Sequence, residues 1–147
     1  MNEEQIQALY METLAEEGFR PKIDDDGDIV FKAEGRTLYI RLYPDDTEYL
    51  QLVLPNFWKI DSDEERVCAT IAANHSTRVT KVTKVFVTKN NTCASIEMFL
   101  PVPELFVKVL NRSVAALSNG AEHFVDKMRE LEQLEEDEPS EFGESED

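Results

Sequence analysis

The amino-acid sequence predicts a single α+β domain, in which an antiparallel sheet packs against helices in the order α-β-β-β-α-β-β-α. Apolar residues recur every three or four positions near both ends of the chain and alternate with polar residues in between, and an acidic segment ends the chain. The length of 147 residues suits one domain with its own core. We assign residues 1–131 to this domain and residues 132–147 to a disordered acidic tail, because the tail has almost nothing to bury.

The first helix is predicted from an apolar stripe at helical spacing. Gly18 follows the stripe and suits a left-handed C-cap, and we expect Phe19 to fold back onto the helix. The stripe consists of Ile6, Leu9, Tyr10, Thr13 and Leu14.

Between residues 29 and 54 the hydrophobic period becomes two, which indicates strands with one buried face. Turn residues at Glu34-Gly35 and Pro44-Asp45-Asp46 divide this segment into a three-stranded meander. The predicted buried face carries Ile29, Phe31, Ala33, Leu38, Ile40, Leu42, Leu50, Leu52 and Leu54, and the opposite, largely wet face carries Lys32, Tyr39, Arg41, Tyr43 and Gln51.

A short second helix is predicted after Ser62, which forms a capping box with Glu65. The expected end of this helix lies at Asn74–Ser76. Its predicted apolar stripe is Val67, Cys68, Ile71 and Ala72.

A hairpin over residues 79–100 is predicted next, with a tight turn at Asn90-Asn91. The second arm buries its even-numbered side chains from Ala94 to Leu100. The first arm has apolar residues on both faces, which indicates either covering on both sides or a bulge that shifts the phase.

One long helix ends the domain, with Pro103 in its first turn and an apolar repeat that reaches Leu131. Gly120 interrupts this repeat and predicts a kink or a break into two helices.

Acidic residues outnumber basic ones by 31 to 15, giving a net charge of −16. Residues 130–147 contain ten acids and no base, so residues 1–129 carry 21 acids against 15 bases. A chain this acidic is repelled by phosphate backbones, and we expect no nucleic-acid partner. No apolar stretch suits a membrane span or a signal peptide, and Cys68 and Cys93 are expected to be reduced, which together favour a cytoplasmic protein.

The sequence predicts no catalytic, cofactor-binding or metal-binding residues, and hence no enzyme and no cofactor. Asp24-Asp25-Asp26-Gly27-Asp28 suggests a calcium loop, but an EF-hand aligned on Gly27 would place Lys22 first and Ala33 twelfth, so an acidic turn is the better interpretation. His75 and His123 lack ligand spacing, and Cys68 fits a core position better than a nucleophile.

Two segments are candidates for binding a partner. Phe57 and Trp58 form either an exposed docking spot or a plug at the edge of the core. The first hairpin arm is locally basic, so the acidic tail or an acidic partner could lie against it, unless its lysines only aid solubility. The candidate residues are Phe57, Trp58, Val79, Lys81, Val85 and Val87.

Over about residues 3–131 the chain resembles the YbjN-like family, whose fold is similar to that of the small type III secretion chaperones. The resemblance rests on the helix ending in LAEEGF, the segment DDDGDIVFKAEGRTLYIRL, the helix reaching AANHST, the run TKVTKVFVTKNN and the amphipathic last helix. It implies a protein-binding α+β domain, regulatory or chaperone-like, and a possible homodimer. It implies no catalytic residues.

The function that we expect is therefore a non-enzymatic protein-binding module that acts through an exposed sheet face or edge. The alternative is a small-molecule-binding or enzymatic domain with a pocket between the sheet and the last helix. A third hypothesis is a structural protein that self-associates.

Overall fold

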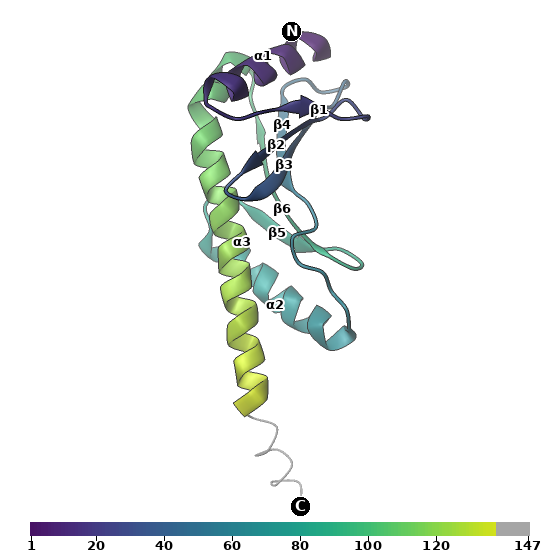
Figure 1. Cartoon of the computed structure of the whole chain (residues 1–147), viewed down its shortest axis with the longest axis vertical. Helices are drawn as coiled ribbons and strands as arrows, with labels where there is room; N and C mark the ends of the chain where they lie inside the picture. The colour runs from purple at the N-terminus through teal and green to yellow at the C-terminus, as the bar shows by residue number, and fades with distance from the viewer. Residues whose placement is uncertain (138–147) are drawn as a thin grey trace, which may run out of the picture.

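A computed structural model describes residues 1–137 of the chain, in which three α-helices pack against one six-stranded antiparallel sheet (Figure 1). The long helix α3 runs beside the sheet, α1 lies across one end of the molecule, and α2 lies toward the other end. The elements are α1 Glu3–Glu16, β1 Lys22–Ile23, β2 Ile29–Ala33, β3 Arg36–Arg41, β4 Tyr49–Leu54, α2 Asp63–Val79, β5 Lys84–Val87, β6 Thr92–Phe99, the 3-10 turn η1 Pro103–Leu105 and α3 Phe106–Asp137.

The strands lie in the order β1-β2-β3-β4-β6-β5, and all pairs are antiparallel. The predicted α+β class and meander are confirmed, and the two-residue strand β1 is an addition that the sequence did not predict. The strand register places the side chains of the predicted buried face next to one another on adjacent strands, so that they form rows across the sheet. In one such row Ile29, Ile40, Leu52 and Ile96 are neighbours, each at most 2% exposed.

Helix α1 ends as predicted, with Gly18 in the left-handed region (φ 94°). The amides of Gly18 and Phe19 donate to the carbonyls of Ala15 and Leu14, which forms a Schellman motif. Phe19 then folds back and packs edge-on against Phe31 of β2, with 5.2 Å between the ring centroids.

Helix α2 begins as predicted but continues beyond the expected end. The Glu65 amide donates to Ser62 Oγ (3.0 Å), while the Glu65 carboxylate accepts from the Asp61 amide instead of the Ser62 amide. The apolar stripe was wrong in part, because Val67 and Ile71 are 60% and 46% exposed. The buried face of α2 consists of small residues, Ala69, Ala72, Ala73 and Ser76, which allow a close approach to the rest of the core.

The first hairpin arm is shorter than predicted, because Val79 ends α2 and residues 80–83 form a loop. Val79 and Val82 therefore lie outside the strand, and among the apolar residues of β5 only Phe86 lies on the face opposite Val85 and Val87. The prediction of a tight turn at Asn90-Asn91 is also wrong. Residues 88–91 connect the strands, closed by a bond from the Thr88 amide to the Asn91 carbonyl.

Helix α3 is continuous through Gly120, so the predicted kink or break does not occur. The glycine instead permits a close approach, since a Cβ at this position would lie 2.8 Å from Thr83 Cγ2. The Ser76 hydroxyl also donates to the Gly120 carbonyl at 2.6 Å. Gly120 is therefore the point where α2 and the loop after it meet α3.

Helix α3 reaches Asp137 and so extends past the predicted domain boundary at residue 131. The remainder of the predicted tail, residues 138–147, lies outside the described residues. Within residues 1–137, no helix combines the length and the apolar character that crossing a membrane requires.

Candidate protein-binding surfaces

One face of the sheet carries the buried rows, and the other face is exposed at Lys84 and Phe99, although Val53 and Ser95 at its centre are only 5% and 1% exposed. We define the open face by the side chains that alternate with the core residues. Its centre is a row that runs from Val30 through Tyr39, Val53 and Ser95 to Lys84. Arg41, Gln51 and Glu97 form the adjacent row. Lys84 and Phe99 have largely exposed side chains, which would not be possible under a covering layer.

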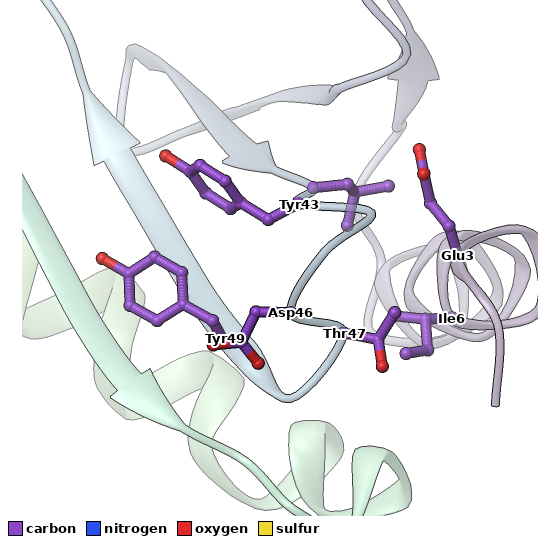
Figure 2. Close-up of a pocket in the computed structure, with 7 residues that line it drawn as sticks. Glu3, Ile6, Tyr43, Asp46, Thr47 and Tyr49 are labelled. Atoms are coloured by element: carbon purple, nitrogen blue, oxygen red, sulfur yellow. The ribbon is translucent and has the colours of Figure 1, made fainter.

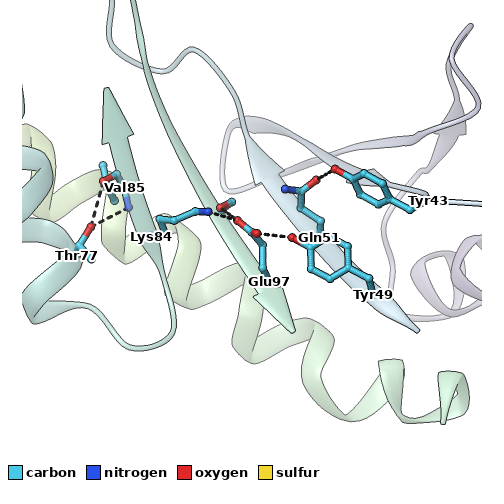
Figure 3. Close-up of polar contacts among 8 residues, drawn as sticks. Tyr43, Tyr49, Gln51, Thr77, Lys84, Val85 and Glu97 are labelled. Carbon is cyan, nitrogen blue, oxygen red and sulfur yellow. Dashed lines mark hydrogen bonds and ion pairs between the residues drawn. The ribbon is translucent and has the colours of Figure 1, made fainter. Parts of the chain in front are cut away.

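A polar network centred on Glu97 lies on the open face (Figure 3). Lys84 Nζ lies 2.6 Å from Glu97 Oε2, which also accepts from the Ser95 hydroxyl at 2.6 Å. The Tyr49 hydroxyl donates to the other carboxylate oxygen. Glu97 thus links three strands, β4, β6 and β5.

The network shifts the pKa values of two of its members. Partial burial alone would raise the pKa of Glu97, but its hydrogen bonds, led by the one from Lys84, outweigh burial and lower the pKa to about 2. Desolvation, followed by the bond to Glu97, raises the pKa of Tyr49 to about 12. The carboxylate is therefore held ionised and the phenol neutral, which suits a fixed structural contact better than proton transfer.

Aromatic side chains extend the open face beside this network. The Tyr43 and Tyr49 ring centroids lie 5.2 Å apart, and those of Tyr49 and Phe99 lie 6.1 Å apart. Phe99 is 75% exposed, the largest exposed fraction among the large apolar residues of the described chain. Large aromatic side chains on a solvent-facing surface are typical of protein-binding hot spots.

The two tyrosines also border a small hollow between α1 and the loop before β4 (Figure 2). Its volume of about 10 Å³ is only about enough for one water molecule. In Figure 2 the rings of Tyr43 and Tyr49 point the same way, away from Ile6. This hollow is therefore too small for a ligand, and the exposed aromatic surface is the relevant feature.

The β5 edge of the sheet is closed by α2. The Val85 amide donates to Thr77 Oγ1 (2.9 Å), and the Thr77 hydroxyl donates to the Val85 carbonyl (3.1 Å), as Figure 3 shows. One hydroxyl thus occupies both outward backbone groups of Val85. An added strand could not pair there unless α2 moved away.

The opposite edge is more accessible. The two-residue turn at Glu34-Gly35 makes Ala33 and Phe31 hydrogen-bonded partners of β3, so the backbone of Lys32 points outward. Strand β1 pairs only with Ile29 and Val30 and stops short of Lys32. Beside this edge lies a groove of about 450 Å³ lined by Gly18, Phe19, Arg20, Lys22, Val30, Phe31, Lys32 and Thr37.

A second groove, the α3 groove, lies between α3, the sheet residue Met98 and the loop after α2. Its volume of about 550 Å³ is within the usual range for ligand sites, and its position matches the pocket that the alternative hypothesis requires. Its lining residues are Val79, Thr80, Lys81, Val82, Met98, Lys108, Val109, Arg112, Ser113, Ala115, Ala116, Asn119 and His123.

The loop that forms one wall of the α3 groove is held in an unfavourable conformation. Val82 has a φ of 51°, in a region that β-branched residues rarely adopt, and its side chain is 71% exposed. Such a residue persists only where its surroundings fix it, and these positions cluster at binding sites. Thr80 Oγ1 hydrogen-bonds to His123 Nδ1 (2.8 Å), and Thr83 packs at Gly120, so both flanks of Val82 are tied to α3.

The six residues predicted to bind a partner do not form one surface. Phe57 and Trp58 pack edge-on against Phe124, with ring centroids 5.3 and 5.7 Å apart, so the plug interpretation describes their place in the fold. Val85 is buried, and Val87 packs against the core. Val79 and Lys81 are exposed and line the α3 groove.

Binding through an exposed sheet face or edge was predicted, but the residues of the open face were not among the six named candidates. Lys84, Glu97 and Phe99 are its most informative members, and the alternation in the second hairpin arm placed the last two opposite the core. The signal that could have identified it is the combination of that alternation with the wet face of the meander, which becomes visible only once β4 is known to pair with β6.

The acidic turn before β2 uses its carboxylates to bind backbone amides. The side-chain oxygens of Asp24, Asp26 and Asp28 lie within 4.8 Å of one another. Asp24 Oδ1 accepts from the amides of Asp26 and Asp28, and Asp28 accepts from the Leu42 amide. These bonds explain the cluster as a turn that anchors the meander.

Groups capable of nucleophilic chemistry are placed in structural roles. The contact of Thr80 with His123 ties a helix end to α3, and among residues 1–137 no carboxylate hydrogen-bonds to that imidazole. Desolvation, followed by a contact with Glu135, raises the pKa of Cys68, which disfavours the thiolate. Neither group has the activated geometry of a nucleophile and its base.

Comparison with known proteins shows similarity in fold only. No protein-family model matches the sequence, and the search of curated proteins found no match. An uncharacterised protein from Methanothermobacter thermautotrophicus has a similar structure, with a TM-score of 0.63 and 14% identity over 86% of this chain and 98% of the other. A chain of the ExsC–ExsE complex is also similar, with a TM-score of 0.57 and 14% identity over 88% of this chain and 96% of the other.

Proposed function

We propose that this chain is a non-enzymatic protein-binding module, chaperone-like or regulatory, whose open sheet face receives the partner. The observation that carries this proposal is the open face itself, with exposed Phe99 at the end of an aromatic cluster. Phe86, on the same face, is also exposed. A partner that covers these rings would remove apolar area from water, at about 25 cal/mol per Å².

The two sheet edges support a specific mode for an extended partner segment. Thr77 closes the β5 edge, whereas the backbone of Lys32 at the β2 edge has no strand beside it among the described residues. An added strand would therefore pair with β2 and extend the sheet. Such a segment would place alternate side chains on the open face.

The comparisons agree with this proposal at the level of the fold. ExsC–ExsE is a complex of two proteins, and one of its chains shares the present fold. We further propose membership of the YbjN-like family, a fold shared with type III secretion chaperones and a cytoplasmic location. We also propose a homodimer, which the exposed Val67 and Ile71, one turn apart on α2, support as a surface for a second copy.

The proposal is tested by affinity capture from an extract of the native cell under gentle conditions. The wild-type chain is compared with a Phe86→Ser/Phe99→Ser variant and with a Val107→Ser variant, in which an exposed apolar residue of α3 is replaced. We expect a specific protein with the wild type and with V107S, and roughly tenfold less of it with the open-face variant.

Two outcomes would contradict this function. The first is recovery of only the bare protein in every sample. The second is equal recovery of the same partner with the wild type and the open-face variant, since the sheet face would then be dispensable. Thermal unfolding of the variants confirms that the exposed substitutions leave the fold intact.

A further inference from the structure

The α3 groove is a cationic site on a strongly acidic chain. Lys81, Lys108 and Arg112 line it, and its lining includes no carboxylate, although the chain has 31 acids against 15 bases. The observed ion pairs of residues 1–137 involve other cations, namely Lys59, Lys84 and Lys127. The three groove cations are therefore available to an acidic ligand.

The walls between these cations are apolar. Val79 and Val82 are about half or more exposed, and Met98, Val109 and Ala116 complete the surface. The loop that carries Val79 and Val82 is fixed to α3 through Thr80 and Gly120. A ligand that combines carboxylates with a large apolar side chain would match the charge and the walls, with little ordering of the loop.

The C-terminal segment of the chain has this chemistry. After α3 ends at Asp137, residues 138–147 contain five acids and no base, and Phe142 stands between Glu141 and Gly143-Glu144. We propose that the α3 groove binds this segment from a second copy of the chain, with Phe142 against Val79 and Val82 and the flanking acids at Lys81, Lys108 and Arg112. This interaction is separate from partner binding at the open face.

The length of the chain decides that the segment comes from a second copy. A helix rises about 1.5 Å per residue, so Asp137 lies roughly 21 Å beyond His123 and roughly 37 Å beyond Arg112 along α3. An extended chain spans at most about 3.6 Å per residue, so Phe142 reaches at most about 18 Å from Asp137. Phe142 therefore falls far short of the Arg112 end of the groove in its own chain, even when the length of its side chain is added.

The test uses the full-length chain with the photo-crosslinker benzoylphenylalanine in place of Phe142. Equal amounts of unlabelled and heavy-isotope-labelled protein are mixed, irradiated and analysed by peptide mass spectrometry. We expect adducts on residues 79–82 or on α3 between Lys108 and Ala116, in pairs that join a light and a heavy chain. Raising sodium chloride from about 0.05 to about 0.5 M should lower the yield several-fold, because salt screens the charges.

Charge reversal supplies a matched comparison within the full-length crosslinking chain. Lys108→Glu/Arg112→Glu should reduce the groove adduct about tenfold, while Arg78→Glu/Lys89→Glu, with the same change in net charge outside the groove, should leave it unchanged. Adducts only within one chain, adducts elsewhere, or equal loss in both variants would overturn the proposal. So would a groove that binds a small molecule and excludes the segment. None of these results affects the capture experiment, which depends on Phe86 and Phe99.

Discussion

The two faces of the sheet differ in side-chain composition and in burial. The face toward the helices is apolar apart from the buried Thr92, and its row from Ile29 to Ile96 is almost completely buried. The open face alternates aromatic rings with a charged network in which Glu97 binds Lys84, Ser95 and Tyr49. The first face stabilises the fold by burial. The second presents ordered aromatic and charged side chains to solvent and is therefore suited to binding a partner protein.

The largest expected difference is in stability, between the buried core of the molecule and the open face. Phe124→Ala removes a fully buried ring that Phe57 and Trp58 pack against, and the free energy of unfolding should fall by about 3–5 kcal/mol. Phe99→Ala, the same change on the open face, should cost less than about 0.5 kcal/mol, because the ring is 75% exposed. Urea unfolding of both variants measures this contrast, and equal losses would contradict the exposure of Phe99 on the open face.

The β5 edge provides the next test. Thr77→Val keeps the shape of the side chain but leaves the amide and carbonyl of Val85 without their partner, and we expect a loss of about 1–2 kcal/mol. Thr70→Val is the matched control, since the Thr70 hydroxyl bonds only within α2, to the Arg66 carbonyl. Indistinguishable T77V and T70V proteins would show that the edge is not closed by this hydroxyl.

Gly120 tests the contact of α3 with the loop after α2. Gly120→Ala places a methyl group against Thr83 Cγ2, and we expect destabilisation of about 1–2 kcal/mol despite the better helix propensity of alanine. Thr83→Ser removes that methyl and keeps the hydroxyl that bonds the Lys81 carbonyl. In a double-mutant cycle T83S should therefore recover part of the loss. Stabilisation by G120A alone would refute the close contact.

The smallest expected effect concerns the Glu97 network and depends on pH. The pKa of Glu97 in the folded chain is about 2, below its ordinary value of 4.5, so its stabilisation is complete above about pH 4.5 and disappears as the pH falls toward 2. Glu97→Gln should therefore cost about 1 kcal/mol at pH 7, a modest value because solvent screens this partly exposed pair. The difference from wild type should shrink toward pH 2. A difference that does not change between pH 7 and pH 2 would contradict the lowered pKa.

The same substitution should alter the ionisation of Tyr49. Its pKa of about 12 owes part of its rise to Glu97, so E97Q should lower the pKa toward the ordinary value of 10. Alkaline titration followed by NMR of the tyrosine rings measures this shift. An unchanged Tyr49 pKa would contradict a contribution of Glu97 to the rise.

The parts of the fold that the sequence predicted correctly are those with a simple period. The alternation from Ile29 to Leu54 identified the buried face of the meander, and Ser62 and Gly18 marked helix ends. These signals are local, because the polarity of each side chain indicates its exposure, and the residue type at a helix end indicates the cap. The class and the order of the elements followed from them.

Errors arose where tertiary contacts decide the structure. Val67 and Ile71 looked like a buried stripe, but α2 buries the opposite face of small residues against its neighbours. Val79 looked like the start of a strand, although it completes that helix. Gly120 looked like a helix breaker, because no local signal reveals the distant Thr83 methyl. An exposed sheet face was predicted, but Glu97 and Phe99 were not named as part of it for the same reason, since the complete open face forms only when β4 pairs with β6.

The most direct test of the central claim is to map a captured partner onto the labelled chain by NMR cross-saturation. We predict that saturation of the bound partner reaches Tyr39, Tyr49 and Phe99 on the open face, together with the amide of Lys32 at the β2 edge. The buried row from Ile29 to Ile96 and the outer side of α2 should be unaffected. A footprint confined to the helices, with no transfer to Phe99, would contradict the account.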